Sequence, residues 1–423
     1  MISTLARSFD KIESNLSREG ISMRDCLLAG FAMFSLKYPS LLQFDNDSRL
    51  DESKHHNLKS LYRLETVPSD TYMRERLDEL DPHKLRRTFK PVIAELQHAG
   101  LLKRYEYHEG CYLVPLDGTG YFYSDDVHCK ECCQKKHRDG KISYYHQFLS
   151  GVIVHPDEKV VIPLCPEPIL KQDGATKNDC ERNAAKRLLK DLRREHPHLG
   201  IIIVEDSLAS NGPHIDELIA QRMHFILGVK PKDHVWLFNW VAHAKTEEHL
   251  MTDDHFRHRF RYVNQAPLSN SRPDLKVNFL EYWEENLNTG KIQHFSWITD
   301  FILDKDNVYK MMRGGRARWK IENETFNTLK NQGYYFEHNF GHGNKHLSTV
   351  FGYLMFLAFL IDQIQQLSCS FFQKALARLK TKSRLWEEWR NFFLDFLFDC
   401  WEDFLRAMAE GLPQQRPVFF NTS

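Results

Sequence analysis

The chain has 423 residues, of which 42% are hydrophobic, 13% aromatic and 27% charged. This is the composition of globular domains, and the length leaves room for about two to four of them, which excludes a disordered chain, a fibre and a small disulfide-stapled scaffold. Lysine plus arginine and aspartate plus glutamate both number 57, so the formal net charge is zero. Any binding of nucleic acid must therefore rest on local basic residues.

The cysteine content and the apolar segments of the sequence predict where the protein is located. The nine cysteines are odd in number and scattered, and Met1–Asp10 has no apolar core segment, which predicts a reducing, cytoplasmic location. The longest apolar run, Val350–Ile361, is interrupted by Gly352 and followed by Asp362. Because a membrane span needs about 20 apolar residues, we expect no membrane segment.

Residues 1–108 have the pattern of a helical module. Met23–Leu36 is apolar at helical spacing, and Pro68–Asp70 precedes the amphipathic stretch Thr71–Leu80 as a helix start signal. His83–Leu102 carries apolar residues at i, i+3 and i+4 spacing. We expect a helix over each of these three stretches.

From Cys111 the pattern changes to short apolar or β-branched runs that alternate with polar helical stretches. We predict strands over Cys111–Leu116, Gln147–Val154, Lys159–Leu164, Gly200–Val204 and His224–Val229, and helices over Asn178–Glu195 and Pro213–Arg222. The order is three strands, helix, strand, helix, strand. It predicts an α/β fold in which helices flank a mixed sheet.

The stretch Asp233–His294 is rich in tryptophan and other aromatic residues. Short alternating pieces such as Val235–Trp240 and Phe260–Val263, with turn residues at Asn270–Pro273 and Asn288–Gly290, predict a β-rich insertion. Beyond it we predict a strand over Phe295–Leu303, a helix over Asn307–Gln332 interrupted at Gly314 and Gly315, a buried helix over Val350–Gln366 and an amphipathic helical stretch over Ala375–Met408.

Three acids lie at positions where ligands collect. Asp117 follows the first predicted strand, Asp206 follows the fourth, and Glu322 lies within the helix after the last strand. The carboxyl ends of strands meet at one edge of an α/β sheet. Two such carboxylates and one from a helix would form an oxygen-rich cage for divalent cations. Each acid alone is more typical of a turn or cap, so the cage depends on the order and spacing of all three.

The helix around Glu322 is the most specific element. Arg318 lies four residues before Glu322 and so on the same helix face, and the block Met311–Lys320 is basic, with arginines that include Arg316 and without any acid. A guanidinium beside a metal-bound carboxylate is suited to hold a phosphate. The alternative is a solvated helix in which the Arg318–Glu322 pair stabilises by only a few tenths of a kcal/mol.

Three motifs combine these features: Asp117-Gly118-Thr119, Val204-Glu205-Asp206, and Arg318-Trp319-Lys320-Ile321-Glu322 followed by Phe326 and Leu329-Lys330. Together they resemble the catalytic motifs of bacterial insertion-sequence transposases of the DDE superfamily, over about residues 109–346. The resemblance implies a ribonuclease-H-like catalytic core in which Asp117, Asp206 and Glu322 are the catalytic, metal-binding carboxylates. It also implies that Arg316, Arg318 and Lys330 bind DNA.

The chain departs from the family pattern at two positions. Gly315 stands where the pattern has tyrosine, so a contact from that tyrosine is lost or comes from Tyr309. Lys330 follows Glu322 by eight residues, where the pattern expects seven and this chain has Leu329. The shifted spacing makes Glu324 a competitor of Glu322. Three other neighbouring acids compete for the strand positions: Asp125 and Asp126 with Asp117, and Glu205 with Asp206.

The resemblance implies a DNA transposase that binds the terminal inverted repeats of its own element. Two Mg²⁺ ions, with Mn²⁺ as a substitute, would support strand cleavage and transfer of the freed 3′-hydroxyl to target DNA. The expected arrangement is a helical module for end binding or dimerisation at 1–108, the core at 109–346 with the insertion at about 233–294, and a helical domain at 347–423. The expected enzyme is cytoplasmic, associated with the nucleoid, and a homodimer in the synaptic complex.

Two other functions stay open: a structure-specific nuclease on the same fold, and a non-enzymatic DNA-binding protein derived from a transposase. A second cluster contains Cys129, Cys132 and Cys133, with His137 and His146 beyond it. Cys129, Cys132 and His137 have zinc-like spacing, and the alternative is a set of reduced thiols in a basic loop. The aromatic and basic stretch Gly333–Lys345 either stacks on unpaired bases or packs onto the C-terminal helices.

Overall fold

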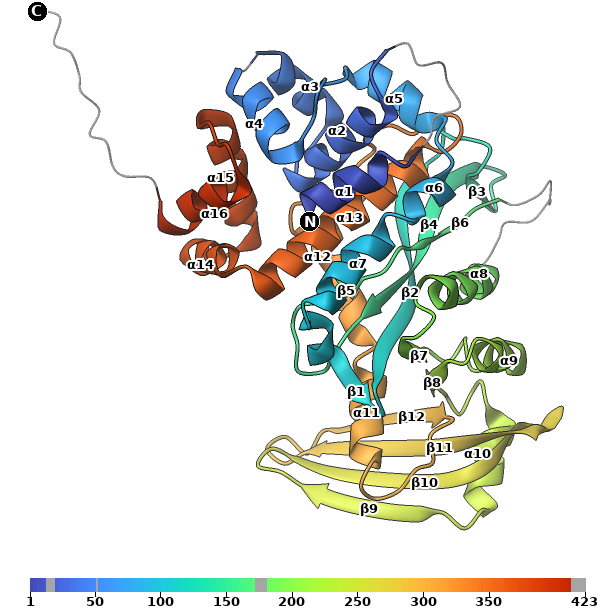
Figure 1. Cartoon of the computed structure of the whole chain (residues 1–423). Coiled ribbons are helices and arrows are strands. Elements are labelled where there is room, and N and C mark those ends of the chain that lie inside the picture. Colours follow the sequence, from blue (N-terminus) through green and yellow to red (C-terminus); the bar gives the residue numbers. More distant parts are fainter. Residues whose placement is uncertain (13–19, 51, 172–180, 412–423) are drawn as a thin grey trace, which may run out of the picture. The chain divides into compact units, whose positions relative to one another are not determined.

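The computed structural model describes residues 1–12, 20–50, 52–171 and 181–411 (Figure 1). The chain folds into two compact units. The helical unit combines Met1–Val92 with Leu329–Ser423, and the sheet unit is Ile93–Thr328. The sequence predicts separate N-terminal and C-terminal helical regions, whereas the structure places both in one unit.

The helical unit contains most of the predicted helices. Ser22 caps α2 by accepting a hydrogen bond from the Asp25 amide at 3.0 Å, which explains where the first predicted helix begins. Two predicted helices are subdivided: His83–Leu102 into α6, α7 and a 3-10 turn at Leu101–Tyr105, and Ala375–Met408 into three helices. The bounds are α1 (Ile2–Phe9), α2 (Met23–Ser35), α3 (Leu41–Leu50), α4 (Glu52–Tyr62), α5 (Asp70–Asp78), α6 (Pro82–Arg86), α7 (Phe89–His98), α12 (Asn327–Asn331), α13 (Leu347–Ser368), α14 (Ser370–Leu379), α15 (Lys382–Asp395) and α16 (Trp401–Glu410).

The 22-residue helix α13 (Leu347–Ser368) forms the core of the helical unit. Its length and apolar composition would suffice to cross a membrane, and 94% of its most apolar stretch is buried inside the protein. A mostly buried core helix passes the same test of length and composition. The stretch before it also packs inward, because Tyr334, Phe336 and Phe340 are buried. This favours the packing interpretation of Gly333–Lys345.

The sheet unit is built on a 12-stranded mixed sheet with the strand order β3-β4-β2-β7-β8-β12-β11-β10-β9. Outside this order, β1 pairs with β2, and β5 and β6 pair with β4. Strands β2, β7 and β8 are parallel and all other pairs are antiparallel. The strands are β1 (Glu106–His108), β2 (Cys111–Ser124), β3 (Cys133–Lys136), β4 (Ile142–Ile153), β5 (Ile162–Pro163), β6 (Glu167–Ile169), β7 (Gly200–Glu205), β8 (His224–Gly228), β9 (Glu247–Thr252), β10 (Phe256–Ser269), β11 (Arg272–Asn286) and β12 (Ile292–Thr299).

The α/β class is confirmed, and helices connect the parallel strands as expected. Helix α8 (Glu181–Glu195) links the antiparallel strands to β7, and α9 (Gly212–Ala220) links β7 to β8. The residues predicted to begin α8, 178–180, lie outside the described residues. The isoleucine and valine side chains of β7 at 201–204 are all buried, as a central strand covered on both faces requires.

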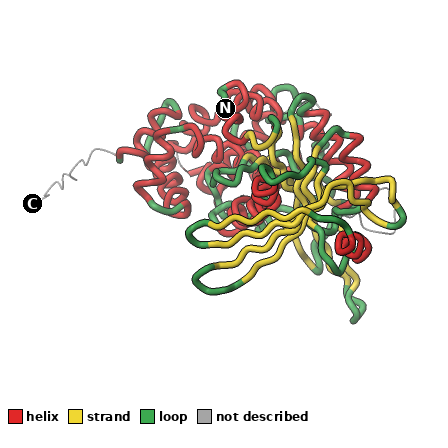
Figure 2. Tube along the Cα trace, turned by 90° about the horizontal axis from the view of Figure 1, so that it is seen from below, coloured by secondary structure: helices red, strands yellow, loops and turns green. Residues whose placement is uncertain are grey.

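Part of the β-rich region differs from the prediction. Val235–Trp240, predicted as a strand, belongs to helix α10 (Val235–His243), because Leu237 and Val241 repeat at helical spacing and are buried. The remaining strands extend the main sheet, since β12 pairs with β8 through Trp297 opposite Gly228. Figures 1 and 2 show the long strands of this region side by side.

Candidate functional site

Asp117 and Asp206 lie at corresponding positions of two neighbouring parallel strands. Strands β2 and β7 pair in register, with Pro115 opposite Val204, so each acid lies two residues beyond this pair. Asp206 directly follows β7, and both acids line one pocket beyond the end of this pairing. The prediction that the strand ends at Asp117 was wrong. It continues to Ser124 because β4 supplies an antiparallel partner on the other side.

Arg318 joins the first and third candidate carboxylates. Its guanidinium contacts Asp117 Oδ2 at 3.0 Å and Glu322 Oε1 at 2.7 Å. Helix α11 (Val308–Arg316) precedes it, and Glu322 lies in a single π-helical stretch, Ile321–Phe326. Such π-bulges are frequent at functional sites, because the widened turn redirects side chains. Residues 201 positions apart in the chain thus meet at one charged contact.

The carboxylates of this site repel one another. Burial raises the pKa of Asp117, the Arg318 guanidinium lowers it, and the neighbouring Glu322 carboxylate raises it, with a net pKa of about 6. Burial also raises the pKa of Glu181, at the start of α8, and the negative charges of Asp206 and Glu205 add to this shift. Glu181 was not among the predicted site residues. Its carboxylate packs closely against Gly118, the residue after Asp117.

The raised pKa of Asp117 predicts a pH dependence of stability in the metal-free protein. Aspartate in an unfolded chain titrates near about pH 3.9, so between about pH 4 and pH 6 the folded protein retains a proton that the unfolded chain has lost. This contribution favours folding at low pH and is lost as the pH rises through about 6. The neutral variant Asp117→Asn should therefore melt at a higher temperature than the unmutated protein at about pH 7.5 in EDTA, and the difference should shrink toward about pH 4. Thermal melts across this range measure it, and a constant difference would contradict the shift.

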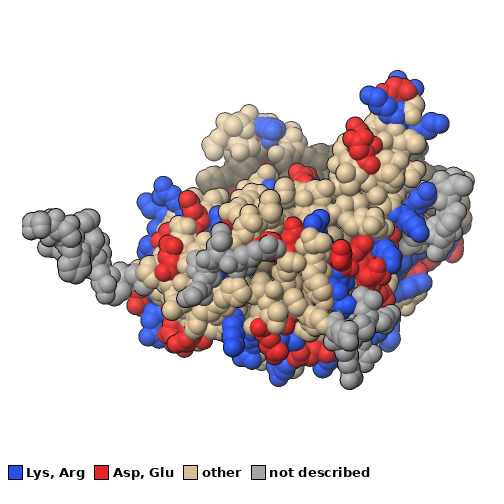
Figure 3. All heavy atoms as spheres, turned by 90° about the horizontal axis from the view of Figure 1, so that it is seen from above, with Lys and Arg blue, Asp and Glu red and all other residues tan. Residues whose placement is uncertain are grey.

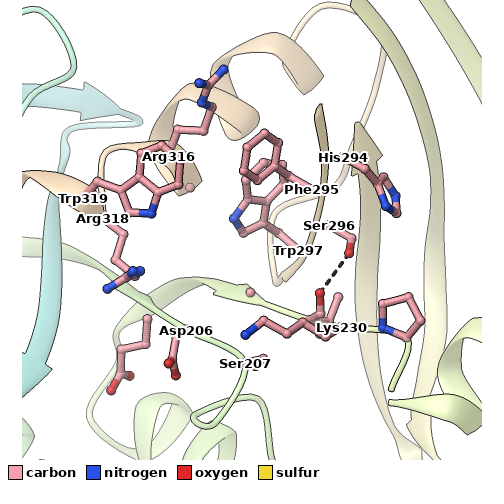
Figure 4. A pocket seen from close by; sticks show the side chains of 15 residues that line it. Asp206, Ser207, Lys230, His294, Phe295, Ser296, Trp297, Arg316, Arg318 and Trp319 are labelled. Atoms are coloured by element: carbon pink, nitrogen blue, oxygen red, sulfur yellow. Dashed lines mark hydrogen bonds between the residues drawn. The ribbon is translucent and has the colours of Figure 1, made fainter. Parts of the chain in front are cut away.

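Two pockets meet at Asp206 and Arg318, each of which lines both. One has a volume of ≈ 310 Å³ and includes Asp117 and Glu181. The other has a volume of ≈ 400 Å³, and Figure 4 shows its lining. Arg316, Arg318 and Trp319 lie on one side of it, Phe295 and Trp297 on another, and Asp206, Ser207 and Lys230 below them. The two adjoining pockets are therefore lined by acidic, basic and aromatic side chains.

The two other predicted DNA-binding residues have local partners. Arg316 lines the larger pocket, where it pairs with Glu284 at 2.6 Å and lies over the ring of Phe295 at 5.1 Å from its centroid. Lys330 belongs to the helical unit, and its ammonium pairs with Glu337 at 2.8 Å. Arg316 is thus held in place within the pocket by a carboxylate and an aromatic ring.

The competing acids have other surroundings. Glu324 interacts electrostatically with Lys320, whose ammonium donates to the Glu158 carbonyl at 2.7 Å. Asp125 accepts a hydrogen bond from Ser143 at 2.7 Å, and Asp126 lies in an exposed loop. Glu205 is buried against His214 at 2.6 Å. Glu322 thus shares Arg318 with Asp117, whereas Glu205 pairs with His214 and lines the same two pockets as Asp206.

Position 315 requires a glycine because the neighbouring side chain leaves no room for a Cβ atom. A Cβ atom at this position would collide with the indole of Trp297, so the tyrosine of the family pattern does not fit here. Tyr309 packs against His258 and Phe260 at the β10–β11 part of the sheet. Trp297 is buried and also lines the larger pocket. The tryptophan therefore occupies the space that a tyrosine at 315 would need.

A comparison of the chain with protein-family models and with curated proteins finds no match. Within the site, the donors are carboxylate oxygens of Asp117, Asp206 and Glu322, which suit hard divalent cations such as Mg²⁺.

Proposed function

We propose that the chain is a metal-dependent DNA transposase with a ribonuclease-H-like core, which cleaves DNA at the ends of its element and joins them to target DNA. The observation that carries the proposal is the contact of one guanidinium, that of Arg318, with both Asp117 and Glu322 beside a pocket lined by Asp206. The sheet order β3-β4-β2-β7-β8, in which α8 leads into β7 and α9 connects β7 to β8, supports the fold assignment.

The chemistry we propose is an in-line displacement at phosphorus, for cleavage with water and for joining with a 3′-hydroxyl as the nucleophile. Mg²⁺, when bound, would activate the nucleophile and neutralise charge that develops on the phosphate. Asp117, Asp206 and Glu322 would hold the ions. Arg318 would change partner from carboxylate to phosphate, since both accept two parallel hydrogen bonds from a guanidinium.

The larger pocket offers contacts for DNA beyond the reacting phosphate. Arg316 and Arg318 provide positive charge, while Trp319 is 43% exposed and presents a ring on which a base can stack. Figure 3 shows positive and negative side chains intermixed on the face it presents, in agreement with the zero net charge. DNA binding in this proposal therefore depends on local contacts near the site and not on a broad basic surface.

The test is a joining assay with purified full-length chain. Its substrates are a labelled duplex made from the DNA that flanks the gene, and a supercoiled target plasmid, with Mg²⁺ in one arm and EDTA in the other. Labelled plasmid that forms only with Mg²⁺ supports the transposase. Cleavage without joining would replace it with a nuclease, and binding without cleavage would leave only a DNA-binding protein.

Arg318 provides a second test of the proposal. Arg318→Ala should reduce cleavage and lower the slope of log binding constant against log salt concentration by about one unit, because one phosphate contact is lost. The control is Arg313→Ala, in the same basic block, since Arg313 pairs with Asp157. Titrations at several salt concentrations measure the slope. A lowered melting temperature with an unchanged slope would show that Arg318 is only structural.

A further inference from the structure

A second group of side chains that can bind a metal lies at the end of the β2–β4 pair that is away from Asp117. Cys129 and Cys132 belong to the segment between β2 and β3, and His146 lies on β4. The two sulfur atoms are 3.8 Å apart, and His146 Nε2 is 3.5 Å from Cys129 Sγ and 3.3 Å from Cys132 Sγ. Two cysteine sulfurs and one histidine nitrogen, which are soft or borderline metal ligands, therefore surround one point.

These separations match a tetrahedral zinc site. Zinc lies about 2.3 Å from cysteine sulfur and about 2.0–2.1 Å from histidine nitrogen, so two tetrahedral ligands are separated by about 3.8 Å for two sulfurs and about 3.5–3.6 Å for sulfur and nitrogen. The three measured distances lie within about 0.3 Å of these values. Thiolate and imidazole ligands together select zinc over magnesium or calcium.

The surroundings have the character of a structural metal site. Cys132 and His146 are fully buried, and the His146 ring stacks on Tyr121 with a centroid separation of 5.8 Å. An apolar shell of this kind excludes water and orients the ligands. The third ligand differs from the one expected: the His137 ring is hydrogen-bonded to Ser143 at 2.6 Å, and the Cys133 thiol donates to the Ile169 carbonyl. Strand pairing has brought His146 into the position that the spacing suggested for His137.

We propose that Cys129, Cys132 and His146 bind one structural Zn²⁺ ion. The ion ties the segment after β2 to β4 and so fixes the β2–β4 pair, which carries the candidate catalytic acid Asp117. His146 lies opposite Phe122, and four residues further along β4 Ser150 lies opposite Asp117. A water molecule or a donor outside the trio completes the tetrahedron. This inference does not depend on the proposed transposase activity.

The experiment begins with metal analysis of the full-length protein purified from zinc-supplemented culture without chelators. We expect about one zinc per chain, and X-ray absorption should give two sulfur ligands at about 2.3 Å. Cys129→Ser and Cys132→Ser should each lose most of the zinc. The matched controls, Cys400→Ser at an exposed position and His137→Gln beside the cluster, should retain it.

A second measurement keeps the proposal falsifiable if the variants misfold. Cobalt added to the metal-stripped, unmutated protein should give the visible absorption of tetrahedral cobalt–thiolate coordination, and an equivalent of zinc should abolish it. Zinc should also raise the melting temperature of the stripped protein. Absence of zinc in the purified protein together with no cobalt spectrum would overturn the proposal. So would a Cys129–Cys132 disulfide in the freshly purified chain, detected as a mass lower by about 2 Da because two thiol hydrogens are lost.

Discussion

Asp206→Asn is expected to abolish strand cleavage and joining while it leaves DNA-end binding nearly unchanged. The substitution removes one negatively charged cation ligand and preserves the size of the side chain. A loss of at least about 10³-fold in rate is expected, since metal-assisted charge stabilisation contributes several kcal/mol and each 1.36 kcal/mol is about tenfold. Binding should be retained or slightly tightened, because a negative charge near phosphate is removed.

The fold should tolerate this substitution. Asp206 is exposed, and its Oδ1 accepts a hydrogen bond from the Leu208 amide at 2.9 Å, which the asparagine amide oxygen can also accept. Asp274→Asn is the matched control, because Asp274 is an exposed acid of the same unit whose carboxylate is 3.5 Å from Arg272. Single-turnover cleavage of labelled ends measures the rate, and band shifts measure binding. Cleavage by Asp206→Asn at the rate of the control would exclude Asp206 from the reaction.

Lys37→Met is expected to cause the largest loss of stability. The Lys37 ammonium is buried in the helical unit, 2.6 Å from Asp362 Oδ2, and lies over the ring of Trp386 at 4.2 Å from its centroid. Tyr334 also donates to the same carboxylate oxygen. Removing the lysine leaves a buried carboxylate without its counter-ion, which costs about 3–5 kcal/mol of folding free energy. Urea denaturation measures the change.

A double variant separates charge from packing at this pair. Lys37→Met with Asp362→Leu removes both charges, so it should recover much of the loss, because a buried apolar pair is often as stable as a buried ion pair. Lys345→Met is the exposed control. Its ammonium pairs with Glu79 at 2.7 Å in solvent, so it should cost less than about 1 kcal/mol. Equal effects of Lys37→Met and Lys345→Met would contradict the importance of the buried pair.

Local sequence patterns were sufficient for much of the fold. The buried isoleucines and valines of β7, and the turn residues after it, predict that strand from its own residues. The pairing of Arg318 with Glu322 follows from helical spacing alone, and the structure confirms their contact. The α/β class and the order of its central elements were also predicted, because each strand or helix carries its own periodicity.

Features that depend on distant partners were not predictable in this way. The extension of β2 beyond Asp117 depends on β4, and a single Asp-Gly pair is as typical of a turn as of a strand. The helix at Val235–His243 was predicted as a strand, because a six-residue apolar run fits both structures. Cys129 and His146 are brought together by strand pairing, which spacing in the sequence does not reveal. The role of Glu181 beside Asp206 is equally non-local.

The most direct test of the central claim is to locate divalent ions in crystals of the protein. Crystals soaked in Mn²⁺, measured near the manganese absorption edge, reveal each bound ion by its anomalous scattering. We expect a peak within about 2.5 Å of carboxylate oxygens of Asp117 and Asp206, with Glu322 in contact or within reach of a second peak, and loss of these peaks in Asp206→Asn. Manganese absent from these acids in crystals that bind it elsewhere, or peaks unchanged by Asp206→Asn, would contradict the claim that they form the catalytic site.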